Sequence, residues 1–586
     1  MVKEAIEGKI KKAYQMAVDE GSFQADRECP EVIFIEKPKT ESHGDFACGV
    51  SLKLARHLKL APMKIAETLK NYIEKVGTNG SGAMSVEAAQ PGFLNFQLDK
   101  SFLSNIIFQI ASAGESFGRG KPNGKKILIE YVSANPTGGL HIGHGRNAIL
   151  GSSLANLLSF AGWHVVQEFY INDCGEQINK LARSAFACYQ KKLGNTVEYP
   201  EDGYPEESLS PYVDKAMAEY KSDPAKLEKA EDLGDIIKEY FRADQEKLLL
   251  SVGVKFDSWF SETSLHKDGK VEEALAQMAS LNYTYDSEGA YWLKAKELGD
   301  ERDRVLKKST GATTYLANDA AYHLNKYKRG FDLMVNIWGA DHHGQVPGLK
   351  AVVKALGEDP DKLELLLTQI VNLNRDGKPV KMSKRMGTVV MLDEVLEEVG
   401  ADAVRYYLAE SNPNNPINFD LELAKKTSKD NPAFYIQYAH ARCCSILRRA
   451  GEEYLDSETG KINPPRVSPE QMREIEQAYG KDEHMFDFTF DNEADNPEAF
   501  AAQKKLVLRL SALPDEVEEA ARVMQPGRIA RYSYEIACDL QRFYEVSRVL
   551  CEDLSVTRSR LGLIMATRQV LQNTLKIIGV SAPERM

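Results

Sequence analysis

The 586-residue chain has no long apolar run and no pair of cysteines at metal-ligand spacing. No stretch approaches the roughly 18 consecutive apolar residues of a transmembrane helix, so we expect neither a membrane span nor a membrane partner. Residues 1–7 are charged and lack an apolar core, so no secretory signal peptide is expected. The eight cysteines include no CxxC pair, and the adjacent Cys443 and Cys444 cannot supply normal zinc-ligand spacing. We therefore expect reduced thiols, a cytoplasmic location and no structural metal.

The chain also has no overall basic charge. Its formal net charge of −12 argues against a general nucleic-acid binder. The charge is uneven, however: residues 451–500 hold 14 acidic and 4 basic side chains, whereas residues 501–586 hold 13 basic and 10 acidic ones. A local basic face could therefore still attract a polyanion. The length predicts three to four domains of about 150 residues each, and the acidic segment reads as a solvated insertion.

A glycine-rich turn between an apolar strand and a helix is the most informative stretch. Residues 127–132 are apolar and β-branched, which predicts a buried strand. Residues 133–140 carry Asn-Pro and Gly-Gly turn signals, and the helical pattern that follows can stop at Gly162. His141 and His144 thus lie where a strand gives way to a helix, which is where open α/β sheets bind nucleotides and phosphates. An ordinary sheet connection with two exposed histidines fits this stretch equally well.

Strands and helices alternate after this point, which predicts an α/β fold with a parallel sheet. We predict strands over 164–171, 333–338 and 365–373, and helices over 318–327 and 345–356. The charge-rich segment 175–300 reads as a mostly helical insertion between the two halves of the sheet. Asp341 and His342 follow the strand 333–338, so we expect them on the nucleotide side of the sheet.

A lysine-rich loop follows a hairpin-type turn at 374–379. It reads Val-Lys-Met-Ser-Lys-Arg-Met-Gly over 380–387. A short lysine-rich loop is usually a solvated surface turn. The chain has no Walker-type motif and no complete GxGxxG motif that could bind a nucleotide elsewhere. The ammonium groups of Lys381 and Lys384, carried on a flexible loop, could therefore contact the phosphates of a bound nucleotide.

Together, in this order, the two stretches resemble the signatures of class I aminoacyl-tRNA synthetases. Residues 141–144 resemble the HIGH motif, and residues 381–385 resemble KMSKS with Arg385 in place of the final serine. The resemblance implies catalysis by His141, His144, Lys381 and Lys384, on ATP whose Mg²⁺ is held by substrate oxygens and water. The implied ATP-binding residues are His141, Gly143, His144, Asp341, His342, Lys381, Met382, Ser383 and Lys384.

A second resemblance concerns the amino acid. Residues 311–322 are similar to the substrate-pocket segment of arginyl-tRNA synthetases, and Tyr315 and Asp319 can share one helical face. Paired carboxylates are the best partners for a guanidinium with five donors. The resemblance implies that Asp319 and Glu130 supply them. The implied arginine-binding residues are Glu130, Ser133, Asn135, His144, Tyr315 and Asp319. Taken singly, Asp319 could instead be a helix-start acid, and Glu130 a surface acid at a strand end.

The resemblance covers nearly the whole chain, including the His-Gly-Asp-Phe-Ala stretch at 43–47 and the helix 430–447. It implies an α/β class I catalytic core with a Rossmann-like parallel sheet, an α+β N-terminal domain that contacts tRNA, and an all-α C-terminal anticodon-binding bundle. We place four units: 1–112, N-terminal; 122–400, catalytic, with the insertion at about 175–300; 401–450, connecting helices; and 451–586, the bundle, with an acidic insertion at about 452–500.

The expected activity is that of an arginine–tRNA ligase. ATP would activate L-arginine, and the arginyl group would pass to the 2′-OH of the terminal adenosine of tRNA(Arg), releasing AMP and pyrophosphate. The resemblance also implies that bound tRNA is needed before arginine is activated, and we expect a monomer.

Three alternatives remain open. A pantothenate-adenylating enzyme would not need the tRNA-sized C-terminal bundle, and a cysteine-adenylating enzyme would need zinc-ligand cysteines. A tRNA-binding scaffold with a dead active site would not need the intact histidines and lysines of the two motifs.

Overall fold

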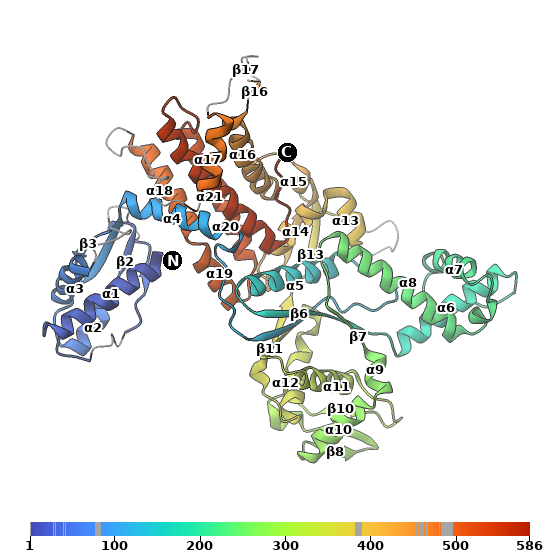
Figure 1. Ribbon diagram of the computed structural model, residues 1–586. Coiled ribbons are helices and arrows are strands. Elements are labelled where there is room, and N and C mark those ends of the chain that lie inside the picture. The colour runs from blue at the N-terminus through green and yellow to red at the C-terminus, as the bar shows by residue number, and fades with distance from the viewer. Residues whose placement is uncertain are drawn as a thin grey trace.

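The computed structural model describes residues 2–26, 29, 31–38, 40, 43–76, 84–380, 390–452, 454–455, 462–463, 467–479, 481 and 496–586. A five-stranded parallel sheet lies at its centre, in the order β12-β11-β5-β6-β7 (Figure 1). Its strands are β5 (Lys126–Glu130), β6 (His164–Ile171), β7 (Ser258–Ser261), β11 (Leu333–Gly339) and β12 (Leu363–Thr368). The predicted α/β fold with a parallel core sheet is confirmed.

Helices cover both faces of this sheet, because successive side chains of a strand point to opposite sides. Ile127 and Ile129 of β5 pack in the cluster that contains α5 (Ile142–Phe160), whereas Leu128 packs with Leu349 and Val353 of α12 (Val346–Ala355). Strands buried on both faces read as continuous apolar runs. That is why β5 could be recognised in the sequence.

The predicted strand 365–373 is wrong as a single element. It divides into β12 and β13 (Val371–Arg375), and β13 leaves the core sheet to pair with β15 (Ile417–Asp420). Between them, the carbonyls of Gln369 and Ile370 accept hydrogen bonds from the buried Arg146 guanidinium, and Ile370 O also accepts the N–H of Ile417 at the start of β15. The predicted hairpin turn is confirmed, since β13 pairs antiparallel with β14 (Lys378–Pro379).

The segment 175–300 is not one helical unit. Its first three helices, α6 (Glu176–Lys192), α7 (Glu206–Glu219) and α8 (Ala230–Ser251), have their own apolar core and project to the right in Figure 1. The chain then returns to the core sheet as β7, a strand that we did not predict because four half-buried residues give no detectable periodicity.

A small antiparallel layer follows β7, with α11 (Tyr315–Lys328) packed against it. Its elements are α9 (Glu262–Lys267), α10 (Lys270–Ser280), β8 (Thr284–Ser287), β9 (Ala290–Leu293) and β10 (Arg304–Lys307). Helix α11 begins three residues before the predicted start at 318, after the extended Thr314.

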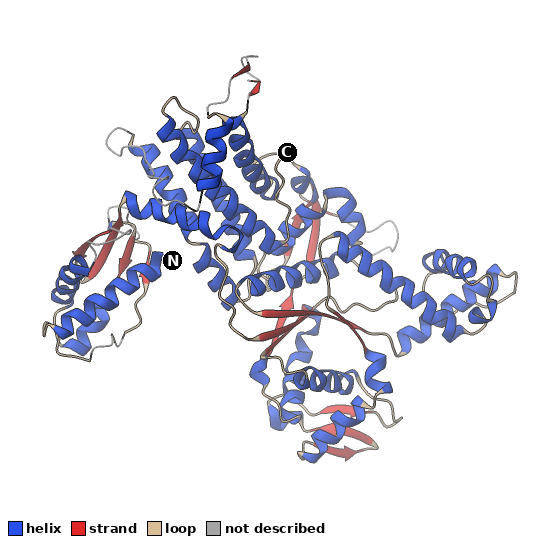
Figure 2. Ribbon diagram, in the orientation of Figure 1, coloured by secondary structure: helices blue, strands red, loops and turns tan. Residues whose placement is uncertain are grey.

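The N-terminal unit is α+β, as Figure 2 shows. An antiparallel sheet in the order β1-β2-β4-β3 packs against three helices, and α4 leads into the core. The elements are α1 (Val2–Asp19), β1 (Ile35–Glu36), β2 (Phe46–Cys48), α2 (Val50–Leu58), α3 (Pro62–Val76), β3 (Met84–Ala89), β4 (Phe93–Leu98) and α4 (Lys100–Ala113).

The described C-terminal part is almost entirely helical (Figure 2). Its long helix α21 contacts α4, α5, α16 and α20, and so joins the bundle to the catalytic core. The elements are α13 (Leu392–Val399), α14 (Ala401–Glu410), α15 (Leu421–Lys425), α16 (Pro432–Gly451), β16 (Tyr454–Leu455), β17 (Ile462–Asn463), α17 (Pro469–Ala478), α18 (Pro497–Ser511), α19 (Leu513–Arg522), α20 (Gly527–Val546) and α21 (Leu554–Ile578). None of the described helices is both long enough and apolar enough to cross a bilayer.

Candidate active site

The two histidines of the HIGH-like stretch begin α5. His141 is the N-cap: its Nδ1 accepts hydrogen bonds from the backbone N–H groups of Gly143 (3.1 Å) and His144 (3.3 Å). His144 Nδ1 accepts the N–H of His141 in return (3.3 Å), and the two rings stack with centroids 3.7 Å apart. Burial lowers the pKa of both rings, that of His144 to about 3. Both are therefore neutral, and each carries its proton on Nε2, where it can be donated to a ligand.

The lysine-rich loop is flanked by described chain on both sides, and the chain that follows it is held near these histidines. Lys381, Met382, Ser383 and Lys384 themselves lie outside the described residues. Before them, Val380 N–H donates to Leu373 O at 2.8 Å. After them, Val390 O accepts the N–H of Ile142 (3.0 Å), and Leu392 N–H donates to Leu140 O (2.9 Å). The chain that follows the lysine-rich loop therefore lies against the N-terminus of α5.

A cavity of about 320 Å³ lies at the carboxyl ends of β5, β6 and β11. Six predicted residues line it: Glu130, Ser133, Asn135, Tyr315, Asp319 and His342. Asp341 and His342 lie in the 3-10 turn η5 (Ala340–Gln345), and their exposed side chains approach each other to 3.5 Å. His141, Gly143 and His144 do not line this cavity, but Asn147, one turn further along α5, does.

The wall next to β5 is a strained turn. Val132 and Ser133 have φ angles of 70° and 46°, in the left-handed region that β-branched residues rarely adopt. Ser133 Oγ donates to Glu130 Oε1 at 2.9 Å and accepts the N–H of Tyr170 at 3.3 Å. Such strain persists only where surrounding contacts fix it, and it is concentrated at ligand sites.

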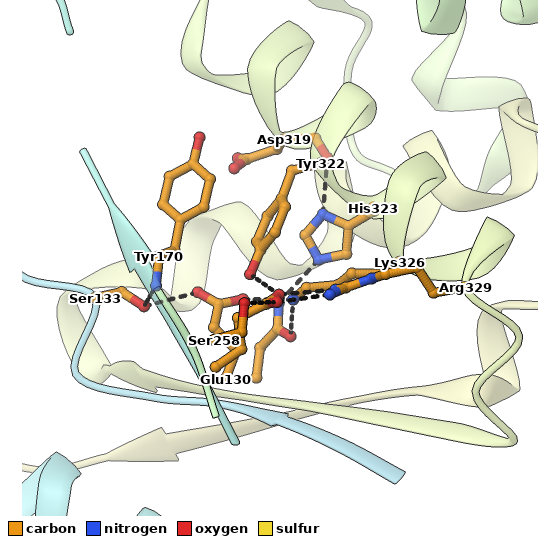
Figure 3. A network of polar contacts seen from close by, with 11 residues as sticks. Glu130, Ser133, Tyr170, Ser258, Asp319, Tyr322, His323, Lys326 and Arg329 are labelled. Carbon is orange, nitrogen blue, oxygen red and sulfur yellow. Dashed lines mark hydrogen bonds and ion pairs between the residues drawn. The ribbon is translucent and has the colours of Figure 1, made fainter. Parts of the chain in front are cut away.

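A buried polar network supports the floor of the cavity (Figure 3). Lys326 on α11 is fully buried and forms an ion pair with Glu130 at 2.5 Å. Its Nζ also donates to Asn336 Oδ1 at 2.8 Å. Glu130 is therefore not the surface acid that its place at a strand end suggested, because its charge is balanced inside the protein.

The neighbouring carboxylate Glu168 is balanced in the same way. It accepts two hydrogen bonds from Arg329 (2.6 and 2.8 Å), one from Tyr322 (2.7 Å) and one from Ser258 (2.9 Å). Burial opposes its ionisation, but these hydrogen bonds hold the pKa of Glu168 below its ordinary value. The network ties α11 to the strands of the core sheet.

Two other cavity carboxylates have no such partner. In the part of the chain that the structure describes, no lysine or arginine forms an ion pair with Asp319 or Glu262. Glu262 accepts a hydrogen bond from Asn318 Nδ2 at 2.6 Å. Burial, with Glu130 and Glu262 nearby, raises the pKa of Asp319 to about 7. A cavity with two uncompensated carboxylates favours a cationic ligand.

Sequence reasoning missed several residues of this site. Glu262 and Asn318 line the cavity, and so does Gln345 at the end of the turn after β11. Glu262 went unnoticed because it follows the unpredicted strand β7. Lys326 had a detectable signal: it lies seven residues after Asp319, on the same helical face, and a lysine on a buried face needs a partner.

The strand-to-helix turn with its two histidines, joined to the chain that flanks a lysine-rich loop, is the arrangement of a class I aminoacyl-tRNA synthetase. Residues 106–428 match the family of class I (R) tRNA synthetase catalytic domains. Residues 1–98 match the arginyl-tRNA synthetase N-terminal domain, and residues 481–586 match the DALR anticodon-binding domain.

Curated relatives and solved structures agree with these matches. The chain is 41% identical to arginine–tRNA ligase 1 of Bacillus anthracis, covering 100% of this chain and 99% of the relative, and 40% identical to the arginine–tRNA ligase of Geobacillus thermodenitrificans, covering 98% of each. A putative arginyl-tRNA synthetase from Campylobacter jejuni superposes with a TM-score of 0.72 at 30% identity, covering 83% of this chain and all of the other. The Thermus thermophilus arginyl-tRNA synthetase, at 21% identity, shares the fold with a TM-score of 0.69 over the full length of both.

The chain therefore belongs to the arginyl-tRNA synthetase family. It is an ATP-dependent ligase that charges tRNA with arginine, and the expected activity is confirmed.

Proposed function

We propose that the cavity above the Glu130–Lys326 pair binds L-arginine, and that activation takes place between this cavity and the N-terminus of α5. One observation carries the proposal: Asp319, which lines the cavity, lacks an ion-pair partner among the described residues, whereas Glu130 and Glu168 are each balanced by a basic residue. The guanidinium of arginine supplies the charge that Asp319 lacks. Bidentate guanidinium–carboxylate contacts are among the strongest polar contacts in proteins.

Other predicted residues orient the rest of the amino acid. Tyr315 is 76% exposed, so its ring is free to pack over a bound side chain. Ser133 and Asn135 line the cavity from the turn after β5 and bind the amino and carboxylate end of arginine. His144 does not line the cavity itself, and we assign it to the same end of arginine because it begins α5 at the close of that turn. Glu130 acts chiefly through its hydrogen bond from Ser133, because its own charge is balanced by Lys326.

ATP occupies the other side of this turn. The Nε2–H groups of His141 and His144 and the backbone N–H of Gly143 donate to its phosphates at the positive end of the α5 dipole. Asp341 and His342 contribute from the turn after β11. Met382 and Ser383 add contacts to ATP, and Lys381 and Lys384 stabilise the leaving pyrophosphate.

Mg²⁺ fits this arrangement. Both motif histidines are neutral, so neither ring adds a positive charge that would compete with the metal. Phosphate oxygens and water would hold it. Bound there, Mg²⁺ neutralises phosphate charge, while the residues of this chain position the two anionic reactants for attack of the arginine carboxylate on the α-phosphate.

The remaining proposals concern the whole protein. The arginyl group passes to the 2′-OH of the terminal adenosine of tRNA(Arg), with release of AMP. We keep the units 1–112, 122–400, 401–450 and 451–586, and propose that the enzyme acts as a monomer in the cytoplasm, where tRNA is charged for protein synthesis.

The test measures ATP consumption with each amino acid, with and without tRNA, for the wild type and for Asp319→Ala. We expect turnover only with arginine plus tRNA. Loss of one partner of a buried charge pair costs about 2–5 kcal/mol, so kcat/KM for arginine should fall by roughly 10²–10³-fold in the variant. The control is Asp268→Ala, at an exposed position after α9, which should behave as the wild type does.

Two other outcomes of this assay would contradict the proposed arginine site. Activation of a different amino acid would leave the class I core in place and remove the roles given to Asp319 and Glu130. Binding of tRNA without any activation would favour the scaffold alternative.

A further inference from the structure

Three metal-ligating side chains meet beside the arginine cavity. The ligand atoms of Cys174, Glu262 and His266 all lie within 4.8 Å of one another. Among the residues that the structure describes, this is the one group of three or more His, Cys, Asp or Glu side chains arranged in this way. Glu262 is buried, Cys174 half-buried and His266 exposed, so the cluster opens to solvent on the histidine side.

The core sheet brings these residues together from distant parts of the sequence. Cys174 follows β6, and Glu262 follows the neighbouring parallel strand β7. Glu262 and His266 are four residues apart on α9, so they share one helical face. This group of ligands could not be predicted from the sequence, because the three residues show no metal-ligand spacing and no CxxC pattern.

A neighbouring aspartate holds the two segments in place. Asp173 Oδ1 accepts the N–H of Thr263 at 2.9 Å, and its Oδ2 accepts the hydroxyl of Ser261 at 2.6 Å. The backbone carbonyl of Asp173 also accepts the Thr263 hydroxyl at 3.2 Å. These bonds tie the start of α9 to the residue before Cys174, and a supported set of ligands lowers the cost of ordering them around an ion.

We propose that Cys174, Glu262 and His266 bind a thiophilic divalent cation of the Zn²⁺ class, with water as the fourth ligand. Thiolate, imidazole and carboxylate are the ligands that Zn²⁺ takes in proteins, whereas Mg²⁺ prefers oxygen ligands alone. The Cys174 thiol gives up its proton to solvent as the Sγ–metal bond forms. Glu262 Oε1 accepts from Asn318, so Oε2 is the oxygen left for the metal.

The cation would act on arginine binding, because the two sites share a residue. Glu262 lines the same cavity as Asp319, and it accepts a hydrogen bond from Asn318, the residue next to Asp319. A cation held by Glu262 removes negative charge from the cavity wall and opposes entry of the guanidinium. The metal should therefore raise KM for arginine. This consequence rests on the proposed arginine site, whereas metal binding itself does not.

The first experiment titrates the full-length, tag-free protein with Co²⁺ alone and records its absorption spectrum. We expect one bound ion and the intense charge-transfer band of a cobalt thiolate. Cys174→Ala should remove the band, and His266→Ala should weaken binding by at least about tenfold. Cys551→Ala and His164→Ala change a half-buried thiol and an exposed ring elsewhere in the protein. These two control variants should leave the cobalt band and the affinity for Co²⁺ unchanged. A missing band in the wild type, or a band that survives Cys174→Ala, would overturn the site.

The second experiment measures KM for arginine with Zn²⁺ buffered by a chelator. We expect Zn²⁺ to raise KM by several-fold in the wild type and to leave it unchanged in His266→Ala. A KM that does not respond in the wild type, although the cobalt band is present, would overturn the link to arginine while leaving the metal site. Failure of arginine activation without Zn²⁺ would count against the proposed function, not against the metal site.

Discussion

At the scale of single residues, the proposed arginine pocket depends on Asp319, one of the two cavity carboxylates that no described lysine or arginine balances. Glu130 and Glu168 lie under the cavity with Lys326 and Arg329 as partners, and Asp319 lies above them without one. Burying an unpaired charge is costly, and this raises the pKa of Asp319 and favours its protonated form. Bound arginine would replace that proton with a guanidinium. The same unbalanced charge supports both selectivity for a cation and a pH dependence.

The pH dependence gives a specific prediction. The pKa of Asp319 is raised to about 7, so its charged form is lost as the pH falls below that value. KM for arginine should therefore rise as the pH falls through 7, by up to about tenfold per pH unit. The buried His323 stays neutral over this range, because burial holds its pKa well below the ordinary value.

Steady-state kinetics from pH 5.5 to 8.5 would check this. Asp319→Asn is the control: it cannot gain or lose the proton, so its weaker arginine binding should vary little with pH. A wild-type KM that stays flat across this range would contradict the role given to Asp319.

At the scale of elements, α5 does more than present two histidines. Arg146, in the second turn of α5, is buried. Its guanidinium donates hydrogen bonds to five backbone carbonyls on two segments: Gln369 and Ile370 on one, and Asn412, Pro413 and Asn415 on the other. Burial lowers the pKa of Arg146 only to about 10, so it remains charged near neutral pH. One guanidinium thus joins the helix of the first motif to the start of β13, the strand whose hairpin leads into the second motif.

Arg146→Lys tests this link. A lysine has three donors on one atom, so it cannot pair all five carbonyls of the two segments that the planar guanidinium spans. Each buried carbonyl left unpaired costs about 1–3 kcal/mol, so we expect a lower thermal midpoint and a loss of kcat of at least about tenfold, with tRNA binding unchanged. Arg302→Lys, at an exposed position, is the matched control. Wild-type kcat in Arg146→Lys would show that this link does not position the two motifs.

At the scale of the whole molecule, the N-terminal unit and the bundle contact each other through a shielded ion pair. Asp45, within the His-Gly-Asp-Phe-Ala stretch, lies 2.8 Å from Lys504 on α18, and the two side chains are only 10% and 13% exposed. Its other oxygen accepts the N–H of Leu98 at 2.8 Å. This contact fixes how a unit that resembles a tRNA-binding domain faces the anticodon-binding bundle.

Asp45→Asn should therefore loosen the placement of the N-terminal unit, which the family resemblance implies contacts tRNA. We expect KM for tRNA to rise several-fold with little change in kcat, and hydrogen exchange to quicken near β2 and α18. Lys3→Met is the control, since Lys3 is exposed and its pair with the half-buried Asp515 is 3.8 Å long and of little energetic weight. An unchanged KM for tRNA would show that the ion pair has no part in placing the N-terminal unit.

The sequence by itself determined the class of fold, the two motifs and the helix that carries Tyr315 and Asp319. These features are local: an apolar strand, a glycine-rich turn and a helical period can each be read within about 20 residues. Strand β7 and the break between β12 and β13 could not be read. The first is too short for a periodic signal, and the second lies in a tertiary contact with Arg146, more than 200 residues away in the chain.

The tertiary structure alone decided which charges remain unbalanced. From the sequence, Glu130 and Asp319 are expected to act as an equivalent pair of carboxylates. In the folded protein, Lys326 forms an ion pair with Glu130, and Arg329 forms one with Glu168. Among the described residues, no lysine or arginine forms an ion pair with Asp319 or Glu262. Parallel strands β6 and β7 likewise bring Cys174 to Glu262 and His266. The effect of a charge depends on its neighbours within a few ångströms, and in this protein those neighbours come from strands and helices far apart in the chain.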